Sequence, residues 1–198
     1  MEHFIRTTIQ QLATTMEQDG LVSVLDDRIE WSVAGKLASN FAEVHPLIFV
    51  KLLLVTDCFF EMNETQMVGI LSCFTNCQSR EKDQSREKDK IDPIVKKTID
   101  LICQWSNELT GNETQEICEH AIVPFMNWTE CEDEYSCKLL LSNGTISTGD
   151  FCKGVLKIIS IIGEMEKALP ERIDLLHKCS TIRPMILKYI ATSQSLYV

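Results

Sequence analysis

Apolar residues recur at helical spacing from the start of the chain. Five of them fall on one face of a predicted helix that ends at Gly20: Phe4, Ile5, Ile9, Leu12 and Met16. Two short apolar runs, LVSVL and RIEWS, follow on either side of Asp26 and Asp27, which is typical of a small β-hairpin. The chain therefore opens with a helix and a hairpin.

From Gly35 onward the pattern stays helical to the end of the chain. Helices are predicted over the ranges 34–43, 46–60, 64–77, 91–109, 113–127, 132–141, 147–169, 170–179 and 181–196. The longest apolar run, PLIFVKLLLVTDCFF, is too short to span a membrane and carries Lys51 and Asp57, so it predicts a core helix. The sequence thus predicts an all-α fold, a multi-helix bundle with a small N-terminal helix-hairpin segment.

The N-glycosylation motif Asn-X-Ser/Thr occurs four times, at Asn63, Asn112, Asn127 and Asn143. The N-terminal stretch MEHFIRTTIQQ lacks the basic and then apolar pattern of a secretory signal, so we interpret these motifs as incidental. Asn63 and Asn112 instead have the pattern of helix caps, because a Gln or Glu follows each shortly after.

Residues 78–89 read QSREKDQSREKD, a hexapeptide written twice without an apolar residue. Such a segment cannot contribute to a packed core, so we predict a solvated loop over residues 78–90. A charged docking tail is the functional alternative. Its charges nearly cancel, so strong RNA binding by this repeat is not expected.

Nine cysteines, an odd number with no CxxC, lie mostly inside apolar runs. This usage favours buried free thiols and an intracellular protein, cytoplasmic or nuclear. Cys118, His120, Cys131 and Cys137 could form a zinc set, but their spacing fits no compact knuckle, and no metal site is predicted. The formal net charge of -10 argues against unaided, nonspecific nucleic-acid binding, so any such contact must be local.

No catalytic residues are predicted. The sequence has no GxxxxGK[ST] phosphate-binding loop and no DExH or DExD box. The histidines are scattered, and none belongs to a recognisable signature with a Ser or Cys nucleophile: His3, His45, His120 and His177. The chain alone is therefore not expected to be an enzyme.

The segment STGDFCKGVLKIISIIGEMEKAL predicts a mostly buried helix that Ser147 caps, with Asp150 as its partner. At 100° per residue the apolar face holds Phe151, Val155, Ile158, Ile162, Met165 and Leu169, widened by Leu156, Ile159 and Ile161. The opposite side is a narrow polar stripe of Lys153, Lys157, Ser160, Glu164 and Lys167. Two interpretations stay open: a core helix whose stripe meets water, or a helix that lines a channel and directs its lysines at phosphates.

Several segments resemble, in order, the C-terminal helical (DSHCT) domain of superkiller-like, exosome-associated DExH-box RNA helicases. TGDFCKGVLKIISIIGEMEKAL resembles the family's GDF-V-R…L-L-x-Q/M helix, and VAGKLASNFAEVHPLIFVKLLL resembles its KGR-A-x-I…LLLTE passage. QMVGILSCF resembles ALLSCF, the terminal IATSQSLYV resembles AASLYL, and Trp128 stands where the family has a Trp before a short helix. The resemblance spans about residues 20 to 198.

This resemblance implies that residues 1–45 are the tail of a winged-helix-like segment and residues 46–198 a C-terminal helical bundle. It implies an accessory domain of an ATP-dependent superfamily 2 RNA helicase, which packs on the ATPase core in cis or in trans. The polar stripe would then line the single-stranded RNA channel. ATP and Mg²⁺ are expected in the associated core and no cofactor in this chain. The expected setting is an RNA-decay or RNA-processing assembly, with no membrane.

The chain departs from the family pattern at the stripe. Lys153 and Lys157 replace common arginines, so bidentate contacts become point-charge contacts, and Ile159, Ser160 and Ile161 occupy positions where further arginines are frequent. RNA contact should be weaker or altered. The alternative function is a helical protein–protein interaction module of the same fold without RNA binding.

Overall fold

The computed structural model describes residues 13–14, 16–25, 28–79, 91–108 and 116–189. The elements in chain order are β1 (Val22–Leu25), β2 (Arg28–Trp31), α2 (Val33–Ala38), α3 (Pro46–Val55), α4 (Glu64–Ser72), α5 (Pro93–Glu108), η2 (Glu119–Ala121), α6 (Ile122–Glu130), α7 (Glu134–Asn143), α8 (Thr148–Ala168) and α9 (Ile173–Ile186). The predicted all-α, multi-helix fold is confirmed.

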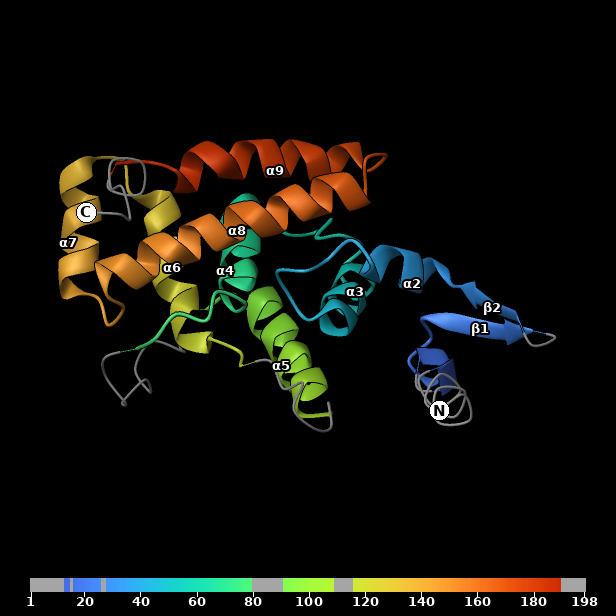
Figure 1. Cartoon of the computed structure of the whole chain (residues 1–198). Coiled ribbons are helices and arrows are strands. Elements are labelled where there is room, and N and C mark those ends of the chain that lie inside the picture. The colour runs from blue at the N-terminus through green and yellow to red at the C-terminus, as the bar shows by residue number, and fades with distance from the viewer. Residues whose placement is uncertain (1–12, 15, 26–27, 80–90, 109–115, 190–198) are drawn as a thin grey trace.

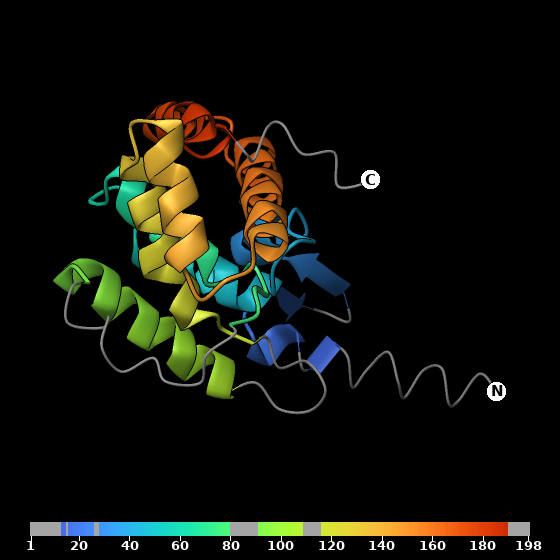
Figure 2. The same cartoon turned by 90° about the vertical axis from the view of Figure 1, so that its left-hand side faces the viewer.

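Helix α4 lies at the centre of the bundle and contacts α5, α6, α8 and α9. Helices α8 and α9 run side by side along one side of the bundle, and α5 lies on the opposite side (Figure 1). Figure 2 shows α8 and α9 nearly end-on, beside α6 and α7. The β-hairpin and α2 occupy the end of the molecule away from α7 (Figure 1).

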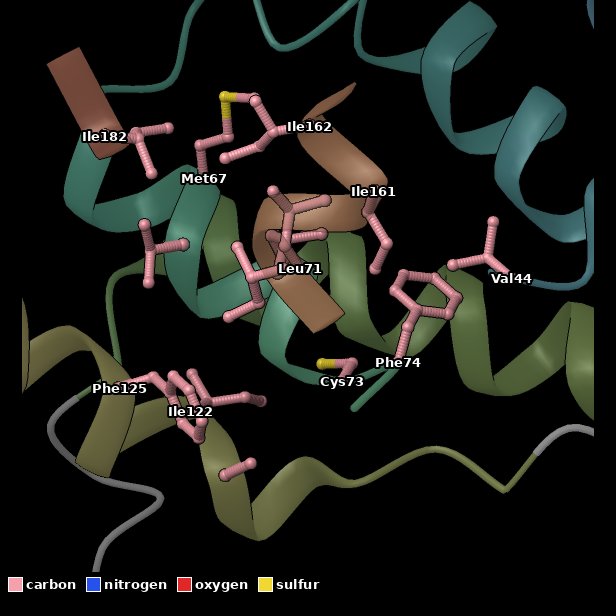
Figure 3. Close-up of a cluster of buried hydrophobic side chains, with 14 of the residues drawn as sticks. Val44, Met67, Leu71, Cys73, Phe74, Ile122, Phe125, Ile161, Ile162 and Ile182 are labelled. Atoms are coloured by element: carbon pink, nitrogen blue, oxygen red, sulfur yellow. The ribbon is translucent and has the colours of Figure 1, made fainter. Parts of the chain in front are cut away.

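The hydrophobic core forms around helix α4, which lies at the centre of the bundle. Its residues from Met67 to Ser72 are all buried, as expected of a helix that is covered on every side. Figure 3 shows the side chains of Met67 and Leu71 directed toward Ile162 and Ile182 of the two overlying helices. Burying one such aliphatic side chain stabilises a fold by about 1.5–3 kcal/mol, so this contact region is a main source of stability.

The N-terminal hairpin is also present as predicted. β1 and β2 pair antiparallel, with Val22 opposite Trp31 and Leu25 opposite Arg28. Gly20 has a φ of 71°, a left-handed conformation that ends the preceding helical turn without steric cost. Most of the predicted first helix lies in residues 1–12, outside the described part of the chain.

The core helix predicted over residues 46–60 is wrong at its C-terminal end, because α3 stops at Val55. The next residues form a left-handed turn at three successive non-glycine positions, with φ of 46° at Asp57, 56° at Cys58 and 62° at Phe59. Left-handed backbone costs roughly 1–2 kcal/mol per L-residue. The turn buries the side chain of Phe59 completely, which offsets part of that cost.

The two helices predicted over residues 170–179 and 181–196 are instead one helix, α9, within the described residues. Its buried positions continue through the predicted break at helical spacing: Leu175, Cys179, Ile182 and Ile186. The hydroxyl groups of Ser180 and Thr181 both donate hydrogen bonds to the His177 carbonyl, so these polar side chains have partners within the helix.

The predicted cap at Asn63 is confirmed as a reciprocal capping box. The Asn63 side-chain oxygen accepts a hydrogen bond from the Gln66 backbone N–H at 2.8 Å, and the Gln66 side-chain oxygen accepts one from the Asn63 backbone N–H at 2.9 Å. The predicted cap at Asn112 and nearly all of the polar repeat lie outside the described residues. The helix predicted over residues 113–127 is wrong at the start of its described part, because residues 116–118 are not helical. The 3-10 turn η2 begins at Glu119, and α6 follows it.

Candidate nucleic-acid interface

Helix α8 begins where the sequence predicts. The Ser147 hydroxyl oxygen accepts a hydrogen bond from the Asp150 amide at 3.1 Å, and the hydroxyl donates to the Asp150 carboxylate at 2.9 Å. Asp150 also lies in the first turn, where a carboxylate interacts favourably with the helix dipole. The lysine stripe therefore starts from a fixed helix end.

The predicted apolar face of α8 is buried. Val155, Ile158, Ile162 and Met165 have no exposed surface, and Phe151 is 1% exposed. Leu156 is an error in the predicted face, because 42% of its side chain is exposed. Position 156 lies next in sequence to Lys157, on the side of α8 that α4 and α9 leave uncovered.

Aromatic side chains hold the N-terminal half of α8 in place. The ring of Phe151 stacks on Phe125 at a centroid distance of 4.3 Å and contacts Trp128 at 5.0 Å. The Trp128 indole N–H donates to the Ile186 carbonyl at 3.0 Å, and the Lys188 ammonium lies 5.9 Å from the Trp128 ring centroid. Trp128 thus joins α6, α8 and the end of α9.

Four of the five predicted stripe residues are accessible side chains on α8. Lys153, Ser160 and Lys167 are exposed and Lys157 is half-buried. From Lys153 to Lys167 the helix rises about 21 Å, at 1.5 Å per residue, so the stripe is long enough for several nucleotides. The Cβ atoms of Lys153 and Lys157 are about 6 Å apart because they are one turn apart.

Glu164, the fifth predicted residue, is occupied by the protein itself. Its carboxylate oxygens accept from the backbone amides of Ala42 at 3.1 Å and Glu43 at 3.3 Å. These bonds hold the loop between α2 and α3 against the C-terminal half of α8. The carboxylate therefore positions a loop, and the cationic part of the stripe is the set of three lysines.

The charge of the stripe is partly offset at one end. Lys153, 69% exposed, lies 3.5 Å from the Asp150 carboxylate. Such an exposed pair contributes little to stability and is readily exchanged for another anion. Among the described residues, neither Lys157 nor Lys167 forms an ion pair, so both ammonium groups are available to phosphates.

Two grooves in the described residues lie away from the stripe, and no stripe residue lines either of them. One groove lies between α6 and α7, and another lies between the left-handed turn and α5.

Most of the cysteine thiols are buried. Cys118 and Cys137 are buried, and His120 Nε2 is 2.9 Å from the Cys77 carbonyl oxygen. The described residues contain no group of three or more His, Cys, Asp or Glu arranged to hold a metal ion. Burial raises the pKa of the Cys118 thiol to about 11 and that of Cys179 to about 12.

Two cationic residues escaped the sequence analysis. Arg172 bonds to Asp57, and Lys178 donates to three backbone carbonyls near Phe59. Their partners lie more than a hundred residues earlier, and the sequence contains no local signal for such pairings.

No protein-family model and no curated protein matches this chain. Within the described residues, no helix combines the length and apolar character that crossing a membrane requires.

Proposed function

We propose that the chain is the C-terminal accessory domain of an ATP-dependent DExH-box RNA helicase and that α8 forms one wall of its single-stranded RNA channel. In this proposal the domain packs on the ATPase core, in cis or in trans, inside the cell. ATP and Mg²⁺ belong to that core. The ordered set of helicase-like segments in the sequence supports the family assignment.

One structural observation carries the RNA part of the proposal. A long helix presents three lysines along one accessible edge, while its opposite, apolar face is buried and is held by capping and aromatic packing. A rigid row of cations suits a phosphodiester backbone, because each ammonium neutralises one phosphate and releases a counterion. The binding expected of three point charges on a chain with net charge -10 is weak and salt-sensitive.

The proposal is tested by RNA binding of a charge-reversed double variant, Lys153→Glu with Lys157→Glu. Anisotropy of a labelled oligouridylate is measured over a range of salt concentrations. Losing two phosphate contacts should weaken binding and reduce the slope of log affinity against log salt by about 1.4, at about 0.7 per contact for a single strand.

A matched control separates local contact from net charge. Lys51→Glu with Lys96→Glu makes the same change of charge at two exposed positions on α3 and α5. It should keep the wild-type salt slope. Equal effects of the two double variants, or no RNA binding by the wild-type chain with and without its ATPase partner, would contradict the proposal and favour an interaction module without RNA.

A further inference from the structure

The second strand of the hairpin, β2, has an open edge. Within the described residues the sheet consists of β1 and β2, so β2 has a neighbour on one side (Figure 1). The Ser32 backbone N–H donates to the Leu21 carbonyl at 3.0 Å, which makes these residues a hydrogen-bonded pair of the antiparallel ladder. Such pairs alternate along a ladder, so the residues two and four positions before Ser32 also direct their backbone groups toward β1. The N–H and C=O groups of Ile29 and Trp31 therefore point along the open edge.

The same strand exposes two large apolar side chains on one face. Ile29 is 51% exposed and Trp31 is 53% exposed, and residues two apart on a strand lie on the same face of a sheet. The other face of β2 carries Arg28 and Glu30, which are both exposed. A two-stranded sheet is marginally stable in water, and an open edge beside an apolar face is a template for a further strand. These features indicate that β2 is a pairing surface.

The base of the hairpin is fixed against α2, so β2 is held in one orientation. The Ser32 hydroxyl donates to the Gly20 carbonyl at 2.6 Å, and its oxygen accepts from the Gly35 backbone N–H at 2.9 Å. Gly35 allows α2 to approach the hairpin closely, because a Cβ at this position would collide with the Leu21 carbonyl oxygen. A strand that is already ordered loses less conformational entropy when it associates.

The sequence of β2 is complementary to itself. When two β2 strands pair antiparallel across a two-fold axis at Ile29, the two Ile29 residues lie opposite each other. Arg28 of each copy then lies opposite Glu30 of the other copy, on one face of the joined sheet. Opposite charges that face each other across two strands stabilise the pairing, and this register contains two such pairs. It also uses the Ile29 backbone groups that point along the open edge.

Neighbouring registers lack this complementarity. An axis at Glu30 would place two carboxylates opposite each other, and the Glu30 backbone groups are already directed toward β1. An axis at Trp31 would place Glu30 opposite Ser32 and would leave Arg28 without an opposite charge. The charges of β2 therefore select both the occupant of the edge and its register.

The formal net charge of -10 on each chain is compatible with this contact. The hairpin lies at the end of the molecule away from α7 (Figure 1). Because the paired strands run antiparallel, the two bundles would lie at opposite ends of the joined sheet. Repulsion between exposed charges is largely screened beyond about 10 Å at 0.1 M ionic strength.

We propose that β2 pairs with β2 of a second copy of this chain and forms a continuous four-stranded antiparallel sheet across a two-fold axis at Ile29. The two isoleucines meet at the axis, and each Trp31 lies diagonal to Ile29 of the other copy, within reach of an aromatic side chain. Since the contact is small, the dimer is weak and forms reversibly with concentration.

Sedimentation velocity of the full chain tests for this dimer at concentrations from about 10 μM to about 1 mM, at physiological ionic strength. The average mass of the wild-type chain should rise with concentration. Ile29→Lys places two like charges opposite each other at the axis and should weaken dimerisation at least about tenfold. Ile173→Lys makes the same substitution at a side chain that is 78% exposed on α9, so this matched control should dimerise like wild type.

A pair of charge variants tests the register. Arg28→Glu alone and Glu30→Arg alone each place like charges opposite each other twice, so each variant should dimerise about fivefold or more weakly than wild type. In a mixture of the two variants the facing charges are opposite again. Heterodimers should therefore form with about wild-type affinity, measured by fluorescence-detected sedimentation with one variant labelled. Both substitutions change exposed side chains, so each melting temperature should stay close to wild type.

Four results would overturn the proposal. A wild-type chain that stays monomeric at about 1 mM has no such dimer. A dimer that Ile29→Lys leaves intact uses another surface. A mixture of the two charge variants that associates no better than either variant alone refutes the register. A monomeric chain whose binding to an ATPase partner is weakened by Ile29→Lys would assign the edge to that partner instead.

Discussion

Two glycines of helix α8 should respond in opposite ways to the same substitution. At Gly154, a new Cβ would lie 2.6 Å from Phe125 Cζ and 2.8 Å from Cys77 Sγ. At Gly163, a Cβ would meet no atom within 4 Å. Because the two sites share one helix, the difference between them isolates packing from helix propensity.

The magnitudes follow from these surroundings. Gly→Ala in a helix interior contributes about 1 kcal/mol of stability when nothing else changes. At Gly154 the neighbours cannot retreat easily, since Phe125 is fully buried and stacked on Phe151, and Cys77 is hydrogen-bonded to the Asp150 carbonyl. Overpacking costs about 1–3 kcal/mol, so we expect Gly154→Ala to lower the free energy of unfolding by up to about 2 kcal/mol.

Gly163→Ala should raise the free energy of unfolding by up to about 1 kcal/mol. For a chain of this size each kcal/mol shifts the melting temperature by about 2–4 °C. Thermal and urea unfolding followed by far-ultraviolet circular dichroism measures both variants. If Gly154→Ala is as stable as Gly163→Ala, the close packing of α8 against Phe125 and Cys77 is refuted.

Three further predictions concern chemistry. The purified chain should hydrolyse no ATP, because its sequence has no phosphate-binding loop, and RNA-stimulated phosphate release that survives repurification would contradict this. Native protein should react with a thiol reagent first at the half-buried Cys103 and Cys131, because buried thiols such as Cys118, whose pKa burial raises to about 11, stay protonated. The unreduced, denatured chain should show nine free thiols, and a lower count would indicate disulfides. Hydrogen bonds from Arg172 lower the pKa of the Asp174 carboxyl group in the folded protein. The carboxylate therefore stabilises the fold at pH values above its unfolded pKa of about 3.8, and this stabilisation is lost as the pH falls through the lower folded pKa. Urea titrations should show that Asp174→Asn is less stable than wild type at pH 7 and that the difference shrinks below about pH 4.

Local patterns in the sequence were sufficient for much of α8. The cap at Ser147 and the buried face both depend on residues within a few positions of each other, and both are present. Leu156 was wrongly assigned to the buried face, because helical periodicity gives the direction of a side chain but not how far the neighbouring helices extend over it.

Long-range polar contacts could not be predicted in the same way. Glu164 pairs with backbone amides 121 and 122 residues earlier, and Arg172 with a carboxylate 115 residues earlier. An apolar run such as PLIFVKLLLVTDCFF carries no sign that its last residues turn left-handed, because that conformation depends on these distant cations.

The central position of α4 also determines when the protein can fold on the ribosome. Helix α4 is complete at Ser72, but α9, which covers part of it, is complete only at Ile186. At about 5–20 residues per second, synthesis of the intervening segment takes roughly 6–23 s. For that time the apolar surface of α4 is open to other nascent chains, so we expect the yield on synthesis to depend on chaperones that shield it.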